Sequence, residues 1–224
     1  MGHPPKLTSS DGADGDTFGI SASINGRTIA VGAWEADGQR GEAYVFVEPP
    51  NGWTNTTETA KLTASDGAIS DALGVSISVS SDTVAVGAFG HLSESGTAYV
   101  YVKPPSGWVN MTETAEIKNT KQGICLGSSV SLDGQLLLVG GDCFQNFRGG
   151  AFVFLQPPTG WHDTSSYKAK LSIPFSFQGD LFGYSSALQG KTAVIGAVNA
   201  PTFPPCGFND CDHGPGEAFI FTTQ

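Results

Sequence analysis

Residues 18–46 read FGISASINGRTIAVGAWEADGQRGEAYVF, and the landmarks of this segment return three more times in the 224-residue chain. The units begin at Lys6, Lys61, Glu116 and Lys170, which are 55, 55 and 54 residues apart. Self-similarity at such a period is the signature of an array of like structural units. The landmarks are Phe18-Gly19, Leu73-Gly74, Leu126-Gly127 and Phe182-Gly183, followed by Val31-Gly32-Ala33, Val86-Gly87-Ala88, Val139-Gly140-Gly141 and Ile195-Gly196-Ala197.

Each unit has the pattern of β-strands. In the first unit Ile20, Ala22 and Ile24 alternate with serines, which is the period of two that a strand shows. Asn25-Gly26 follows directly and is a strong hairpin signal. The next strands are expected at 28–33, 42–47 and about 59–63, with a Pro-Pro-x-Gly-Trp turn between the last two. No segment shows a convincing helical period with caps, so the chain is predicted to be all-β.

Four antiparallel strands per unit are typical of a β-propeller blade, and blades stack around an axis because one blade cannot bury both of its faces. Residues 6–10 supply a fourth strand without the first three, and the last unit ends after its third strand. We therefore predict a single domain, 1–224, with repeats at about 6–60, 61–115, 116–169 and 170–224. The expected form is a four-bladed ring closed by pairing of the N-terminal strand with the last blade. A fragment of a larger propeller and two chains forming eight blades remain alternatives.

The charge balance excludes several partners. Acidic residues outnumber basic ones 21 to 11, and the formal net charge is −10. A chain of this charge offers no broad basic surface for phosphates or for an anionic membrane. No apolar segment approaches the roughly 20 residues that a membrane helix needs. We expect neither a nucleic-acid partner nor membrane insertion.

The Phe-Gly and Val-Gly-Ala landmarks resemble the FG-GAP repeat, the blade of integrin α-subunit propellers and of many bacterial surface proteins. The sequence of residues 61–67, KLTASDG, is more similar to the bacterial type. The final proline of the motif is absent, and Trp34, Phe89, Asp142 and Val198 stand in its place. The resemblance implies a β-propeller with a ligand-binding face. Integrin-like blades carry an Asp-rich calcium loop between their first two strands, but connections such as 25–27 lack those ligands, so that calcium site is not expected here.

A second place for a metal is the acidic segment with Asp11, Asp14 and Asp16. Clustered carboxylates suit calcium, and they also cap turns by accepting hydrogen bonds from backbone N–H groups. Asp66, Asp71 and Asp180 recur at matching places. Because structure repeats from unit to unit whereas a site need not, the capping role is favoured. We expect no cofactor, with calcium as the alternative.

The four cysteines are Cys125, Cys143, Cys206 and Cys211. The first two flank a predicted hairpin and are placed well for a disulfide. The last two are five residues apart and would close a small ring, with a zinc site that uses Asp212 and His213 as the rival interpretation. Disulfides indicate an oxidising compartment, and sequons at Asn55 and Asn110 agree with it. A secreted or cell-surface location is expected.

The loops between the second and third strands differ most between units, and variable loops on a repeated framework are where function is expected. Strand alternation places all four loops on one rim. A non-catalytic extracellular recognition or adhesion module is predicted, which binds a protein or a glycan as a monomer or as a self-assembled ring. The expected contact residues are Trp34, Asp37, Arg40, Phe89, His91, Phe144, Phe147, Arg148 and Phe203.

Two other functions remain open. A propeller-based hydrolase would need converging catalytic groups at the rim, for which Asp37, Glu94, Asp142 and His213 are the candidates. A purely structural fragment of a larger FG-GAP protein would bind nothing. The recurring Trp53, Trp108 and Trp161 suit packing anchors of the blade turns better than sugar-stacking platforms.

Overall fold

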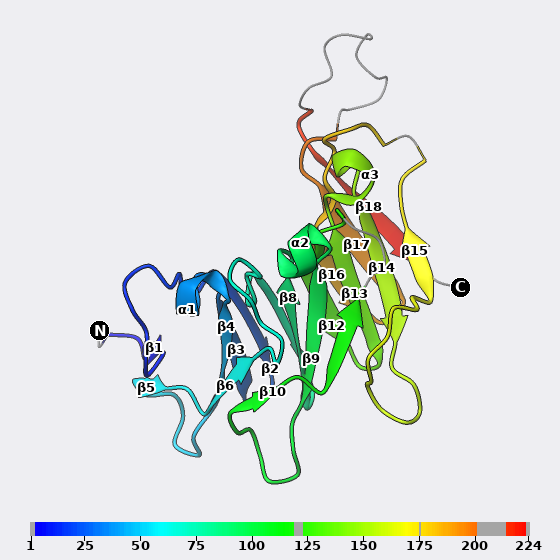
Figure 1. Ribbon diagram of the computed structural model, residues 1–224. Coiled ribbons are helices and arrows are strands. Elements are labelled where there is room, and N and C mark those ends of the chain that lie inside the picture. Colours follow the sequence, from blue (N-terminus) through cyan, green and yellow to red (C-terminus); the bar gives the residue numbers. More distant parts are fainter. Residues whose placement is uncertain (1–2, 119–122, 175, 201–213, 223–224) are drawn as a thin grey trace.

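The computed structural model describes residues 3–118, 123–174, 176–200 and 214–222 (Figure 1). Within these ranges the chain is all-β, as predicted, with strands grouped into successive antiparallel sheets and three helical turns of four residues each. The predicted strands 28–33 and 42–47 are confirmed to the residue. No helix of the described residues is long and apolar enough to cross a membrane.

Four successive sheets correspond to the repeats, and we number them blades 1 to 4. Each blade begins with an inner strand and proceeds outward through hairpins, since each strand pairs with the one before it. Blade 1 comprises β2 (Ser21–Asn25), β3 (Thr28–Ala33), β4 (Glu42–Val47) and β6 (Ala60–Thr63); blade 2 comprises β7 (Ser76–Ser80), β8 (Thr83–Ala88), β9 (Thr97–Val102) and β11 (Ala115–Lys118); blade 3 comprises β12 (Leu126–Asp133), β13 (Leu136–Gly141), β14 (Gly150–Leu155) and β15 (Ala169–Leu171); blade 4 comprises β16 (Phe182–Gln189), β17 (Thr192–Ala197) and β18 (Glu217–Thr222).

The short elements lie at the two ends of the blades. The helical turns α1 (Ala36–Gln39), α2 (His91–Glu94) and α3 (Phe144–Phe147) connect the second and third strands of blades 1 to 3. Sequence periodicity did not predict them, because a single turn is too short to show a helical period. The strands β1 (Leu7–Thr8), β5 (Thr56–Thr57) and β10 (Met111–Thr112) lie at the outer edges, where β1 pairs with β5 and β10 with β6, both in parallel.

The recurring glycines mark the contacts between blades. A Cβ added to Gly32 of blade 1 would lie 2.0 Å from the carbonyl oxygen of Gly74 in blade 2. The same 2.0 Å approach recurs between blades 2 and 3, at Gly87 and Gly127, and between blades 3 and 4, at Gly140 and Gly183. The Val-Gly-Ala glycine of one unit and the Phe-Gly glycine of the next are therefore the two halves of one backbone contact, which explains why they recur together.

The serines of the inner strands also join neighbouring blades. Ser21 donates a hydrogen bond to the carbonyl oxygen of Gly74 at 2.6 Å, and the backbone N–H of Val79 donates to Ser23 at 3.0 Å. Equivalent bonds repeat at the next two interfaces. The alternation that predicted a strand thus places apolar side chains on one face of the strand and the serines that hydrogen-bond the next blade on the other face. Apolar packing completes each interface, with Val45 of blade 1 and Val84 of blade 2 in one buried cluster.

The predicted ring closure is not formed. The N-terminal strand β1 pairs with β5 and not with blade 4, and in the described residues β18 pairs with β17 alone. Figure 1 shows β1 and β18 at opposite ends of an open arc of sheets. At its own end of the arc the N-terminal segment is held by side chains, since Asn55 accepts a hydrogen bond from the backbone of Lys6 at 2.9 Å and Glu58 accepts one from Ser10.

The predicted disulfide between Cys125 and Cys143 is present, with its Cα atoms 5.4 Å apart. It joins the residue before β12 to the second residue after β13, across the first hairpin of blade 3. The other predicted pair, Cys206 and Cys211, lies outside the described residues.

Candidate functional site

The loops between the second and third strands of blades 1 to 3 gather on one side of the arc, where Figure 1 shows α1, α2 and α3. Each forms a left-handed turn with three consecutive residues at positive φ. In α1 these are Asp37, Gly38 and Gln39, with φ of 48°, 68° and 69°. The corresponding residues of α2 and α3 carry side chains, at a cost of roughly 1–2 kcal/mol per residue.

The unusual backbone of these turns has a structural use. Their last carbonyl groups accept hydrogen bonds from the next blade: Arg40 from the N–H of Leu73 at 3.0 Å, and Glu94 from the N–H of Cys125 at 2.9 Å. Phe147 accepts in the same way from the N–H groups of Gly179 and Leu181, which lead into blade 4. The rim loops are therefore tied to the following blade and form a continuous surface.

The expected contact residues divide into three groups. Asp37, Arg40, Phe147 and Arg148 are exposed, and the first two form an ion pair at 3.2 Å. Trp34 and Phe89 are half-buried on neighbouring loops, with ring centroids 6.3 Å apart. His91 and Phe144 are buried, and Phe203 lies outside the described residues.

The expectation that Phe144 offers a contact surface is wrong. Its ring packs edge-on against Phe152, with centroids 5.8 Å apart, and the Lys170 ammonium lies 4.3 Å from its ring centroid. It points inward because it is the first residue of the left-handed turn, the place that Ala36 and His91 occupy in the other blades.

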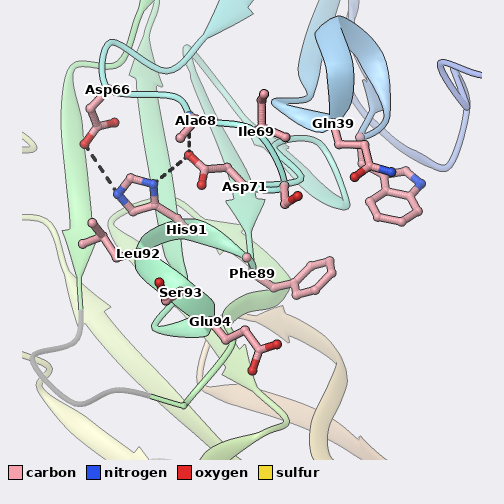
Figure 2. A pocket seen from close by; sticks show the side chains of 13 residues that line it. Gln39, Asp66, Ala68, Ile69, Asp71, Phe89, His91, Leu92, Ser93 and Glu94 are labelled. Carbon is pink, nitrogen blue, oxygen red and sulfur yellow. Dashed lines mark hydrogen bonds and ion pairs between the residues drawn. The ribbon is translucent and has the colours of Figure 1, made fainter.

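An open depression of about 590 Å³ lies on the rim between blades 1 and 2 (Figure 2). Trp34 and Phe89 form part of its wall, and Ile69 and Leu92 stand beside them with 66% and 59% of their surfaces exposed. Asp66, Asp71 and Glu94 also line it, and no lysine or arginine does. The depression therefore combines apolar surface with acidic groups.

His91, in the same depression, is only 3% exposed and is surrounded by carboxylates (Figure 2). Its Nδ1 lies 2.9 Å from Oδ2 of Asp71. Its Nε2 has no hydrogen-bond partner and lies 3.5 Å from Oδ2 of Asp66 and 3.6 Å from Oε1 of Glu116. Burial, followed by the hydrogen bond to Asp66, raises the pKa of Tyr99 far above its usual range, so its hydroxyl stays protonated and donates to Oδ1 of Asp66 at 2.7 Å.

The corresponding place in blade 1 has different residues. The Lys61 ammonium binds the carboxylates of Asp11 and Glu42, the latter at 3.1 Å, and Tyr44 donates to both carboxylates. Lys61 occupies the place that Glu116 has in blade 2, and Ala36 occupies that of His91. In blade 1 the cation that binds the two carboxylates is therefore a lysine side chain of the same blade.

The recurrence of aspartates at matching places in the units is explained by turn capping. Asp16 accepts a hydrogen bond from the N–H of Ala13 at 2.7 Å, Asp71 from Ala68 at 2.7 Å and Asp180 from Phe177 at 2.6 Å. Asp11 instead binds Lys61, and among the described residues Asp11, Asp14 and Asp16 do not converge on one point. The carboxylates that do converge with a histidine are those of blade 2.

Sequence reasoning named His91 for the rim but missed its association with Asp66 and Glu116. The signal was present: Glu116 stands where the other three units have lysine, and His91 stands where the first unit has alanine. These two departures from the repeat distinguish the side chains of blade 2 from those of blade 1.

The hydrolase candidates are not gathered. Asp37 pairs with Arg40, Glu94 lines the rim depression, and His213 lies outside the described residues. Asp142 lines a second depression of about 600 Å³ among the inner strands, where burial raises its pKa against hydrogen bonds that lower it.

Comparison with known proteins agrees with this architecture. The blades define a repeat-built all-β array of the propeller type. The FG-GAP repeat model matches residues 4–46 and 56–101, so the chain carries FG-GAP repeats. No curated protein matches the chain.

Two solved structures share the fold. One is the computationally designed Ika4 protein, with a TM-score of 0.56 and 12% identity over 100% of both chains. The other is hydrazine synthase of Kuenenia stuttgartiensis, with a TM-score of 0.55 and 14% identity over 91% of this chain and 51% of that chain. At these identities the likeness concerns the fold alone.

Proposed function

We propose that the chain is a non-catalytic extracellular recognition module that binds its partner through the rim between blades 1 and 2. The observation that carries this proposal is the exposure of large apolar side chains there, Ile69 and Leu92, beside the Trp34–Phe89 pair. Apolar surface with a few polar groups is characteristic of recognition sites. Exposed aliphatic groups favour a protein over a glycan, and the acidic lining favours a basic partner surface.

The extracellular part of the proposal rests on the disulfide. Cys125–Cys143 requires an oxidising compartment to form and persist. The sequons contribute less, because their asparagines have a structural role: Asn110 accepts a hydrogen bond from the backbone of Lys61 as Asn55 does from Lys6. Asp163 does the same for Glu116 without being part of a sequon.

The hydrolase alternative has one favourable feature, the buried His91–Asp71 pair, which has the geometry of an oriented general base. It also requires a nucleophile, and in the described part of the chain no side chain hydrogen-bonds Nε2 of His91. Recognition is therefore the better supported function. Turnover of an ester or glycoside substrate that His91→Ala abolishes would reverse this choice.

A binding screen against extracellular proteins and glycans tests the proposal. Trp34→Ala combined with Leu92→Ala is expected to weaken capture of the selected partner at least tenfold with an unchanged circular dichroism spectrum. Val109→Ala removes another exposed apolar side chain, from a segment outside the rim, and serves as the control. Equal capture by both variants would show that the rim is not the contact surface, and a screen without any partner would favour the purely structural alternative.

We also propose that the arc closes into a ring with a second copy of the chain. The two ends of the arc carry the unmatched halves of an inter-blade contact: a Cβ added to Gly196 would meet only Ser185, and one added to Gly19 would meet nothing within 4 Å. On blade 4, Ile220 is 71% exposed although the corresponding Val45 and Val100 are fully buried. Among the described residues β18 pairs with β17 alone, and its other edge would accept a strand such as β1.

Light scattering measures the mass of the assembly in solution and so tests the two-chain ring directly. A mass of twice the 23.2 kDa of one chain is expected. A single-chain mass at high concentration would favour closure of four blades within one chain or contact with other repeats.

A further inference from the structure

We propose that Asp66, His91 and Glu116 of blade 2 form a binding site for a divalent first-row transition metal, with Zn²⁺ as the best fit. The three residues come from three elements: the loop before β7, the first residue of α2, and β11. One ligand atom from each lies within 4.8 Å of the others.

The distances fit a shared ion better than direct pairing. Nε2 of His91 lies 3.5 Å from Asp66 and 3.6 Å from Glu116, which is long for a hydrogen bond to either carboxylate. A tetrahedral zinc ion with bonds of about 2.0–2.2 Å holds its ligand atoms about 3.3–3.6 Å apart. Both distances from Nε2 therefore fall in the range expected between two ligands of one ion, and the third pair of ligand atoms lies within 4.8 Å.

The histidine is prepared for metal binding. With Nδ1 donating its proton to Asp71 at 2.9 Å, the lone pair of Nε2 is directed toward Asp66 and Glu116. A carboxylate behind a metal-binding imidazole is the usual arrangement that sets its tautomer and orientation. A buried ring nitrogen without a partner is otherwise costly, and a metal ion would satisfy it.

The neighbouring groups are consistent with a cation. Asp66 also accepts a hydrogen bond from Tyr99, and Thr97 and Lys118 contact Glu116, at 3.4 Å and 2.5 Å. Lys118 offsets one of the three carboxylate charges around His91. Asp66 is the exposed ligand, with 42% of its side chain accessible, so the fourth coordination position would face solvent.

Blade 1 supplies an internal comparison. There a cation is built into the chain, because Lys61 binds Asp11 and Glu42 at the same place in the fold. In blade 2 Glu116 stands in the place of the lysine, His91 in that of the alanine and Thr97 in that of Glu42, so a carboxylate and an imidazole replace the lysine and the second carboxylate of blade 1. The presence of an imidazole ligand argues against calcium, which prefers six to eight oxygens.

The test is titration of the metal-free protein with Zn²⁺, and separately with Ca²⁺, by calorimetry. One Zn²⁺ per chain is expected, with at least tenfold weaker Ca²⁺ binding. His91→Ala, which reproduces Ala36 of blade 1, and Glu116→Lys, which reproduces Lys61, are each expected to weaken zinc binding at least tenfold while thermal unfolding remains cooperative. His162→Ala removes an exposed histidine of the described chain and should change nothing.

A second measurement separates this site from the cysteine-containing segment. Co²⁺ bound by Asp66, His91 and Glu116 should give a tetrahedral spectrum without a thiolate charge-transfer band. A thiolate band, or zinc binding that is lost in His213→Ala and retained in His91→Ala, would overturn the proposal. So would the absence of zinc binding, or zinc affinity equal in wild type and His91→Ala.

Discussion

Gly87 in blade 2 lies so close to Gly127 in blade 3 that a Cβ on the first would stand 2.0 Å from the carbonyl oxygen of the second. Gly87 has no positive φ, so the restriction is spatial and not conformational. The contact between the two backbones sets how closely adjacent blades approach. It is the physical reason for the glycine landmarks of the repeat.

Gly87→Ala is expected to lower the free energy of unfolding by about 2–3 kcal/mol, because the backbone of blade 3 must move to admit the methyl group. Urea unfolding followed by circular dichroism measures the change. Gly196→Ala is the matched control: its Cβ would meet the Ser185 hydroxyl at 2.3 Å, as the Cβ at Gly87 would meet that of Ser76 at 2.4 Å, but no backbone of a next blade. Equal losses in the two variants would show that the serine, and not the Gly87–Gly127 contact, limits the space.

Removal of the Cys125–Cys143 disulfide is expected to lower the free energy of unfolding by about 3 kcal/mol, since the bond closes a loop with a sequence separation of 18 residues. Unfolding of wild type with and without reductant gives the value. The Cys125→Ser, Cys143→Ser double variant should unfold like the reduced wild type and should no longer respond to reductant at this bond. A reductant-independent midpoint of the wild type would contradict the prediction.

The Asp11–Lys61 pair predicts a loss of stability in acid. The hydrogen bond from the Lys61 ammonium, followed by its charge, holds the pKa of Asp11 below its ordinary 3.8 against the effect of burial. A carboxyl group whose pKa is lower in the folded state contributes stability above its unfolded pKa and loses it as the pH falls through the folded pKa. The difference in unfolding free energy between wild type and Asp11→Asn should therefore shrink below about pH 4.

Asp14→Asn, in the same loop, is the control for this pH effect. Its difference from wild type should not follow the same course, because no ammonium group contacts Asp14 in the described structure. A constant difference between wild type and Asp11→Asn from pH 7 to pH 2 would show that the ion pair does not stabilise the fold.

Ile220→Lys is expected to reduce the mass from two chains to one in light scattering, because the charge would be buried at the proposed contact between copies. Since Ile220 is exposed within one chain, the free energy of unfolding of the isolated chain should change by less than about 0.5 kcal/mol. Leu155→Lys, on the third strand of blade 3 and also exposed, should leave the mass unchanged. A dimer that survives Ile220→Lys would place the interface elsewhere.

The sequence alone determined the elements that depend on local pattern. The alternation at Ile20–Ile24 and the signal at Asn25-Gly26 predicted the first hairpin, because a period of two and a tight turn are properties of a few adjacent residues. The Cys125–Cys143 bond followed from the same logic, since its two cysteines flank one hairpin. Because the chain repeats, the strand prediction applied to each unit in turn, whereas the disulfide belongs to blade 3.

Only the tertiary structure decided how the blades are arranged and which side chains meet. The β1 strand pairs with β5 at one end of the arc and not with β18 at the other, and local pattern does not specify that placement. Likewise Asp66, His91 and Glu116 follow one another at intervals of 25 residues in sequence, and they converge only through the pairing of β9 with β11 and the return of the chain at α2. Contacts of this kind depend on strand register and on the stacking of blades, which no short segment of sequence specifies.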